Sequence, residues 1–214
     1  MTHLGAPVPP SAETLSFAAQ AREVHWNLSR ADLVAWSLRL DEGELSAQGA
    51  LVARTGEFTG RSPKDKFTVR DALTESKVDW GAVNQAMSPE HYDRLEALME
   101  AGAAGQRLFV QDLTAGADEG LQIGVRVVTA YAWHNLFAQN MFLRPSPETR
   151  ERFVADWTVI DLPHVTADPS AHGTASGTFI VVNFTKRTVL IGGTQYAGEI
   201  KKSIFGVLNF LLPE

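Results

Sequence analysis

Residues 178–212 read TFIVVNFTKRTVLIGGTQYAGEIKKSIFGVLNFLL, and this stretch carries the strongest structural signal in the chain. Two runs rich in β-branched and aromatic residues, 178–184 and 187–191, are separated by two residues, which predicts a β-hairpin. Gly192-Gly193 then ends the second strand, and the apolar run from 198 to 212 predicts a helix. An antiparallel hairpin followed by a helix is typical of a mixed α/β sheet layered with helices.

Strand-like and helix-like segments also alternate through the rest of the chain. Serine caps or apolar residues at helical spacing predict helices, and short β-branched runs predict strands. The expected helices cover residues 11–22, 29–38, 88–99 and 133–141, and the expected strands cover 44–54 as a short hairpin, 67–70, 107–113, 121–129 and 156–162. This order predicts one α/β domain over residues 11–214, after a flexible, Pro-rich lead-in at residues 1–10.

The composition places the chain among ordinary globular proteins. Hydrophobic residues make up 44% of its 214 residues, which is enough for one large core. The formal net charge of −6 argues against a general nucleic-acid binder and against a protein that binds anionic membranes, since both need an excess of basic residues. The sequence has no cysteine, which excludes disulfides, thiolate zinc sites and cysteine nucleophiles. It also shows no secretory signal and no membrane span, so we expect a cytoplasmic protein.

The first candidate for chemistry is the loop at residues 59–66, TGRSPKDK. Three cations, Arg61, Lys64 and Lys66, lie within six residues, next to a glycine that allows a ligand to approach the backbone. We expect Arg61 to make the main contact, because a guanidinium matches a carboxylate or phosphate with two parallel hydrogen bonds, whereas a lysine supplies a point charge. The pattern leaves open the alternative of a solvated basic loop that caps a strand.

The second candidate is the glycine turn and helix start that follow the hairpin, where free backbone N–H groups are aimed at an anion. Gly193 and Gly198 have the spacing of the glycines in a phosphate-binding P-loop, but Glu199 stands where that motif needs its lysine, so we exclude a P-loop. Lys201 and Lys202 point about a third of a helical turn apart, so at most one of them faces an anion squarely. A helix start with surface lysines is the alternative.

Metal and hydrolase signatures are absent from the sequence. The six histidines show no metal-ligand spacing, and the nearest cluster, His164, Asp168 and His172, falls on a polar loop where we expect exposure to solvent. His134 lies in an apolar helix and is expected to be structural. The sequence contains no serine-hydrolase elbow and no dinucleotide-binding glycine motif.

Three ordered blocks of sequence resemble the ATP-dependent phosphoenolpyruvate carboxykinase family. The first is residues 55–67, TGEFTGRSPKDKF, the second is residues 132–142, AWHNLFAQNMF, and the third runs from Thr178 to Phe205 through the glycine turn. Their order and spread make the match far more specific than either loop alone. Gln195 is a small departure, because the family usually has a larger or acidic residue there. The resemblance implies the N-terminal-domain fold of that family, a mixed β-sheet layered with helices.

The resemblance also implies a reaction and roles for four residues. Members of this family convert oxaloacetate and ATP to phosphoenolpyruvate, carbon dioxide and ADP in gluconeogenesis, with Mg²⁺ and Mn²⁺ as cofactors. By resemblance, Arg61 clamps the substrate carboxylate, Tyr196 packs against the substrate, and Lys202 reaches the second metal, the substrate and the nucleotide phosphate, with Lys201 as its neighbour. A developing enolate oxygen needs cations close by, so we expect Arg61 and Lys202 to converge on one partly buried cationic pocket.

The family's phosphate-binding loop, its remaining metal ligands and its adenine-binding lobe have no counterpart in these 214 residues. We therefore expect the chain to supply part of the oxaloacetate or phosphoenolpyruvate site and to be inactive alone, with ATP and the metals bound mainly by the missing C-terminal half. We also expect the apolar helix at 198–212 to be partly uncovered, which favours self-association. The alternative is a standalone binding module for a small dicarboxylate or phosphorylated acid. Nucleic acid and membranes are not expected as partners.

Overall fold

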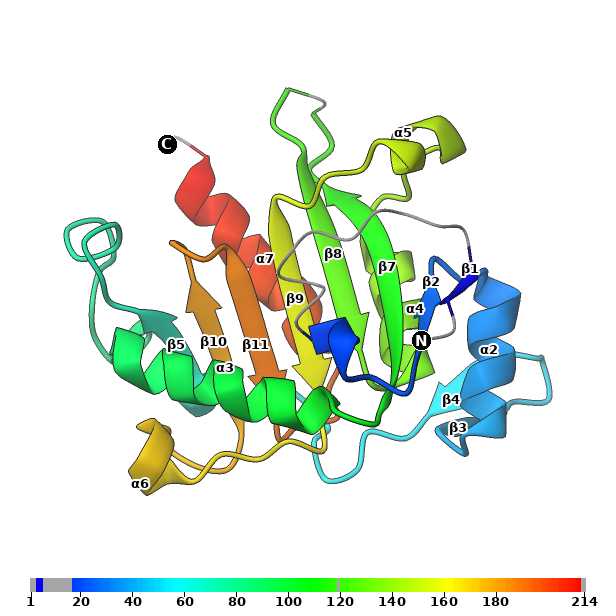
Figure 1. Ribbon diagram of the computed structural model, residues 1–214, viewed down its shortest axis with the longest axis horizontal. Coiled ribbons are helices and arrows are strands. Elements are labelled where there is room, and N and C mark those ends of the chain that lie inside the picture. Colours follow the sequence, from blue (N-terminus) through cyan, green and yellow to red (C-terminus); the bar gives the residue numbers. More distant parts are fainter. Residues whose placement is uncertain (1–2, 6–16, 119, 213–214) are drawn as a thin grey trace.

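The computed structural model describes residues 3–5, 17–118 and 120–212, and its central element is the hairpin that the sequence predicts (Figure 1). Strands β10 (Phe179–Asn183) and β11 (Thr188–Gly192) pair antiparallel. The connection has four residues rather than the expected two, because the Lys186 amide donates to Asn183 Oδ1 at 2.9 Å and Arg187 takes a positive φ of 52°. The hairpin is therefore confirmed, while the predicted turn is too short.

Within the described residues, this hairpin lies in a mixed sheet of nine strands. Neighbouring strands of the sheet as described run parallel except in the pairs β7 with β8 and β10 with β11. The order across the sheet is β1 (His3–Gly5), β2 (Glu23–Trp26), β7 (Arg107–Ala115), β8 (Ile123–Thr129), β9 (Trp157–Leu162), β11, β10, β5 (Lys66–Val69) and β6 (Gln85–Met87). Strands β3 (Gly43–Leu45) and β4 (Leu51–Ala53) form the separate hairpin expected at 44–54. The predicted mixed α/β fold is confirmed.

The edges of the sheet differ from the sequence expectations. Strands β2 and β6 have four and three residues, which is too short for a periodic pattern, and they form by pairing with β7 and β5. Strand β1 belongs to the segment expected to be a lead-in, and it pairs parallel with β2. Half of the expected helix at 11–22 lies outside the described residues; in the described half, residues 17–19 are helical and residues 20–22 are not.

Helices cover both faces of the sheet, and alternate residues of a strand contribute to two separate cores. On one face, Phe179 and Val181 of β10 pack in the core that α3 (Pro89–Ala103) covers. On the other face, Ile180 and Val182 pack in the core formed with α4 (Ala132–Met141) and α7 (Gly198–Leu211). In Figure 1, α3 lies in front of the sheet, and α4 and α7 lie behind it. The remaining helices described are α2 (Arg30–Arg39), which packs against α4, and the short elements η1 (Pro63–Asp65), α5 (Pro147–Glu151) and α6 (Pro169–His172).

Caps fix the starts of the helices. The hydroxyls of Ser29 and Ser88 accept hydrogen bonds from backbone amides three residues further on, as the sequence predicts. Helix α4 has a cap that the sequence does not reveal, because the Glu42 carboxylate accepts from the amides of Ala132 and Trp133 at 3.1 and 3.0 Å. Burial raises the pKa of Glu42, and these two amides oppose that shift. None of the helices in the described ranges has the length and hydrophobicity needed to cross a membrane.

A buried ion pair joins β7 to β8. Asp112 lies opposite Arg126 in the antiparallel register, and Arg126 Nε donates to Asp112 Oδ1 at 2.6 Å. The side chains of Arg126 and Asp112 are only 1% and 0% exposed. The side-chain Nδ2 of Asn27 donates to the other carboxylate oxygen of Asp112 at 3.2 Å. The guanidinium carbon of Arg126 lies 5.1 Å from the ring centre of Trp26. Both charges in this part of the core are thus compensated by polar or aromatic neighbours.

Replacing Asp112 with Ala removes the carboxylate from a buried guanidinium, and we expect the free energy of unfolding to fall by about 3–5 kcal/mol. Urea denaturation followed by circular dichroism measures this change. The matched control is the double variant Asp112→Leu with Arg126→Met, which removes both charges and should be more stable than the single variant. An Asp112→Ala protein with the wild-type urea midpoint would contradict the role given to the pair.

Candidate functional site

One cavity brings together cations from three separate parts of the fold. Arg61 lies in the loop before η1, Lys66 opens β5, and Lys202 lies near the start of α7. The cavity has a volume of about 410 Å³, and we call it the cationic cleft. Its lining consists of Arg61, Pro63, Lys66, Ala82, Val83, Asn84, Glu199, Lys202, Phe205, Gly206 and Asn209. The structure thus places Arg61 and Lys202 on one cleft, as the sequence leads us to expect.

Glu199 connects the two sides of the cationic cleft. It lies in the first turn of α7 and is 4% exposed, and its Oε1 accepts a hydrogen bond of 2.8 Å from the Ser62 amide. Burial raises the pKa of Glu199, while the Ser62 amide, Arg61 and Lys66 oppose that shift. From the sequence, Glu199 serves only to exclude a P-loop. Its bond to Ser62 spans 137 positions, so no local pattern reveals it.

Lys66 is the third cation of the cleft, and from the sequence it is expected only to supply a point charge in the loop. Burial lowers the pKa of Lys66, Glu199 opposes that shift, and Lys202 and Arg61 add to it. Gly206 of α7 lies close by, since a Cβ built on it would be 3.5 Å from Lys66 Nζ. The ammonium group is therefore close to the wall of the cleft formed by α7, and it lies in the field of two other cations and one carboxylate.

Arg61 and Lys202 occupy different depths of the cleft. Arg61 is exposed, so its guanidinium is available to a ligand that arrives from solvent. Lys202 is half-buried, and its Nζ lies 4.7 Å from the ring centre of Phe205 in the same helix. The expectation of a partly buried Lys202 in a cationic pocket agrees with this geometry.

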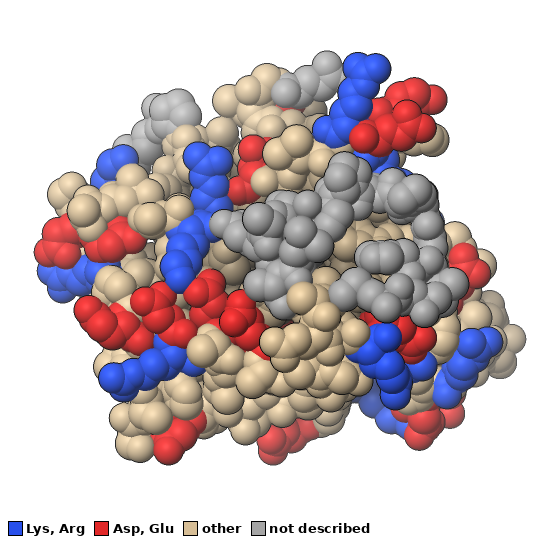
Figure 2. Space-filling model, in the orientation of Figure 1, with Lys and Arg blue, Asp and Glu red and all other residues tan. Residues whose placement is uncertain are grey.

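The cationic cleft gathers three basic side chains in a protein whose net charge is acidic. Figure 2 shows the face on which α3 lies, where acidic side chains gather over that helix. Two of them, Asp93 and Glu96, bind Lys186 Nζ at 2.9 and 2.6 Å. The cleft lies along α7, which covers the opposite face of the sheet. The net charge of −6 is therefore compatible with an anion site.

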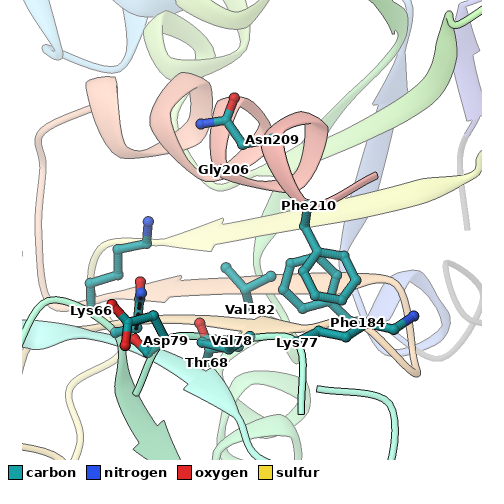
Figure 3. Close-up of a pocket in the computed structure, with 11 residues that line it drawn as sticks. Lys66, Thr68, Lys77, Val78, Asp79, Val182, Phe184, Gly206, Asn209 and Phe210 are labelled. Atoms are coloured by element: carbon teal, nitrogen blue, oxygen red, sulfur yellow. Dashed lines mark hydrogen bonds between the residues drawn. The ribbon is translucent and has the colours of Figure 1, made fainter. Parts of the chain in front are cut away.

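A smaller compartment of about 230 Å³ continues the cleft along α7 (Figure 3). The two cavities share the lining residues Lys66, Asn84, Gly206 and Asn209. Figure 3 shows Lys66 extending toward α7 at one end of this compartment and Phe210 packed on Phe184 at the other. The two phenyl ring centres are 4.0 Å apart. The smaller compartment thus has Lys66 at the end that it shares with the cleft and two phenyl rings at the other end, where Lys77 Nζ lies 5.8 Å from the ring centre of Phe210.

Lys201 is directed to the other side of α7. It lines a separate cavity of about 260 Å³, which we call the apolar groove. The groove is lined by Thr114, Ala115, Gly116, Ala117, Met141, Phe142, Leu143, Lys201, Ile204, Phe205 and Leu208. Lys201 is not among the described residues that line the cationic cleft, whereas Phe205 lines both cavities. Phe205 and Leu211 are 52% and 47% exposed, and self-association through such side chains stays a prediction.

The loop between β11 and α7 carries Tyr196 and Gln195. Tyr196 is half-buried, and a Cβ built on Gly198 would come within 2.4 Å of its Cε1. Tyr196 is not among the described residues that line the cleft, so its contact with substrate stays a prediction. A Cβ built on Gly56, where φ is +59°, would lie 3.1 Å from Gln195 Oε1. The Gln195 side chain, at the position where this chain differs from the family pattern, therefore lies against the loop that leads to Arg61.

Within the residues that the structure describes, no three His, Asp or Glu side chains gather as a metal site. In the cluster singled out from the sequence, Asp168 Oδ1 accepts from the Ser170 amide at the start of α6. The rings of His172 and His164 contact the backbone oxygens of Asp168 and Gly102. His164 and Asp168 are exposed, as expected, and His172 is half-buried.

Comparison with known proteins agrees with the resemblance seen in the sequence. A family model described as phosphoenolpyruvate carboxykinase matches residues 22–214. The phosphoenolpyruvate carboxykinase (ATP) of Afipia carboxidovorans is 52% identical over 193 residues, which cover 90% of this chain and 36% of that protein. The corresponding protein of Brucella suis is 53% identical over 190 residues, covering 89% of this chain and 35% of that protein. The one of Bacillus velezensis is 49% identical over 192 residues, covering 89% and 36%.

The chain therefore spans about a third of the length of the curated relatives it matches. The match extends over both candidate loops and over the helix that carries Lys202. This chain belongs to the phosphoenolpyruvate carboxykinase family.

Proposed function

We propose that this chain forms the acid-binding part of a phosphoenolpyruvate carboxykinase active site. The whole protein would convert oxaloacetate and ATP to phosphoenolpyruvate, carbon dioxide and ADP, as a step of gluconeogenesis in the cytoplasm. The observation that carries the proposal is the convergence of Arg61, Lys66 and Lys202 on one cleft. Membership of the family supports it independently.

The arrangement of the cations suits the proposed chemistry. When oxaloacetate loses carbon dioxide, the electron pair of the broken C–C bond moves onto the ketone oxygen, which becomes an enolate. Ammonium groups placed beforehand in a partly buried cleft stabilise this charge as it develops, and Lys66 and Lys202 are placed in this way. The exposed guanidinium of Arg61 is suited to grip a carboxylate of the arriving acid through two hydrogen bonds.

Glu199 has an organising part in this proposal. Its carboxylate binds the Ser62 amide, so the residue beside Arg61 is fixed to the helix that carries Lys202. The same carboxylate lies in the field of Arg61 and Lys66 and reduces their mutual repulsion when the cleft is empty. An acid that enters the cleft therefore meets cations that are already in place.

The family resemblance also implies ATP, Mg²⁺ and Mn²⁺, and a bound metal would neutralise charge on phosphate and polarise substrate oxygens. The described cleft residues do not make a metal site by themselves. Glu199 Oε1 accepts from the Ser62 amide, and the ammonium group of a lysine is no metal ligand until it loses a proton. We propose that ATP and the metals are held mainly by the other two thirds of the protein, with Lys202 reaching them from this side.

Oxalate, a small planar diacid, is the probe that tests the acid site in this chain. Replacing Arg61 or Lys202 with Met should each weaken oxalate binding about tenfold or more, because each removes a hydrogen bond from a charged donor. Isothermal titration calorimetry measures the dissociation constants.

Lys64→Met is the matched control for this experiment. Lys64 lies in the same loop as Arg61 and is exposed, but it is not among the described residues that line the cleft. The control removes the same charge from the chain and should leave oxalate affinity nearly unchanged. If Lys64→Met weakens binding as much as Arg61→Met does, the cleft is not the acid site.

Oxalate affinity should also depend on pH through Lys66. Its pKa is lowered from the ordinary value of 10.5, and the protonated form attracts the acid, so affinity should fall as the pH rises through this lowered pKa. The fall should begin at a lower pH than an exposed lysine would give. Lys66→Arg keeps the positive charge and should flatten this part of the profile. Titrations of both proteins over the alkaline range test this, and identical profiles would rule out Lys66 as the titrating group.

We propose that the chain alone has no carboxykinase turnover, since one third of the protein does not provide the whole in-line geometry of phosphoryl transfer. A coupled assay that follows ADP formation from oxaloacetate and ATP tests this directly. Turnover above the background of an Arg61→Met preparation would show the proposal to be wrong.

A further inference from the structure

A buried histidine outside the cleft holds the backbone of the loop that leads into α7. The side chains of His134 in α4 and Asp161 in β9 are 0% and 1% exposed. His134 Nδ1 lies 2.8 Å from Asp161 Oδ2, and His134 Nε2 lies 3.0 Å from the carbonyl oxygen of Gln195. The imidazole ring therefore bridges the central sheet and the loop between β11 and α7.

Hydrogen-bond chemistry fixes which way this bridge works. A backbone carbonyl only accepts, so His134 Nε2 must carry a hydrogen and donate it to Gln195. The bond between His134 Nδ1 and Asp161 Oδ2 contains one further proton, which is carried by one of these two atoms. Asp161 thereby orients the ring for the bond to Gln195, as carboxylates commonly do for functional histidines.

The dyad is anchored to rigid parts of the fold. Asp161 pairs with Thr129 of β8 and with Ile191 of β11 in the middle of the sheet. The imidazole ring packs edge-to-face against Trp133, with ring centres 4.3 Å apart, and against Tyr131, with ring centres 5.2 Å apart. The ring thus has little room to turn away from the Gln195 carbonyl.

The loop held by His134 connects directly to both sides of the cationic cleft. The side chain of Gln195 lies against Gly56, at the start of the segment that carries Arg61. Three residues after Gln195, α7 begins, and its first turn brings Glu199 to the Ser62 amide. A shift of the Gln195 backbone would therefore displace the helix that carries Lys202 relative to the Arg61 loop.

We propose that His134, oriented by Asp161, is a positioning residue of the cleft. By holding the Gln195 carbonyl it fixes the start of α7, and so sets the distance between Lys202 and Arg61. The proposal rests on the proposed acid site, and it adds a residue that does not itself line the cleft in the described part of the chain. A histidine that only fills the core would leave the cleft unaffected once the protein is folded.

Two polar substitutions separate these roles, because each keeps one of the two bonds. The amide nitrogen of Gln occupies the place of His134 Nε2, so His134→Gln keeps a donor for the Gln195 carbonyl. The same variant loses the contact with the Asp161 carboxylate. The shorter amide of Asn occupies the place of Nδ1, so His134→Asn keeps the Asp161 contact and leaves the Gln195 carbonyl without its donor. The two variants have similar polarity, and both remove the aromatic packing.

The first readout does not depend on any ligand. Hydrogen exchange measured by NMR at the Ser62 and Tyr196 amides, which donate to Glu199 and to the Thr194 hydroxyl, reports on the loop and the helix start. In His134→Asn we expect these amides to exchange about tenfold faster than in His134→Gln. Amides of α3, which covers the opposite face of the sheet, serve as the internal reference.

The second readout is oxalate binding by calorimetry. His134→Gln should stay close to the wild-type affinity, and His134→Asn should bind about fivefold to tenfold more weakly, the effect of about one hydrogen bond. If the wild-type chain binds no oxalate, the proposed acid site fails, while the exchange data still decide whether His134 positions the loop. Equal behaviour of the two variants in exchange, including unfolding of both, would overturn the positioning role.

Discussion

A carboxylate buried among cations is the constraint on which the cleft depends. Arg61, Lys66 and Lys202 would repel one another if nothing of opposite charge lay between them. Glu199 supplies that charge, and its bond to the Ser62 amide fixes the loop of Arg61 to the helix of Lys202. The energetic cost of burying Glu199, seen in its raised pKa, is offset by the neighbours that it holds in place.

The fold brings these groups together through the order of its strands. Strand β10 lies between β11 and β5, so the loop before β5 and the helix after β11 meet at the same end of the sheet. Strand β11 runs directly into the glycine turn, where Gly193 takes a φ of +69° that a side chain would disfavour. The cleft is thus formed by segments far apart in sequence that the sheet brings together. Figure 1 shows β11, β10 and β5 as neighbours in the sheet.

Local signals account for what the sequence predicts well. The hairpin of β10 and β11, the Ser88 cap of α3 and the α7 helix each depend on residues within a few positions of one another. The sequence does not reveal features that depend on distant partners. Glu42 caps α4 across 90 positions, and Glu199 binds Ser62 across 137, so neither leaves a local pattern. The family resemblance identifies Arg61 and Lys202, but only the coordinates show that Lys66 joins them.

Phe205 is a wall common to two cavities with different contents. On one side of Phe205 lies the cationic cleft, where Lys202 Nζ is 4.7 Å from the centre of the phenyl ring. On the other side lies the apolar groove, which Met141 and Leu143 also line. The two cavities lie on different sides of α7, and Phe205 lines both of them. A molecule that moves the Phe205 ring from the side of the apolar groove would also move the aromatic face beside the Lys202 ammonium, so this side chain couples the two cavities.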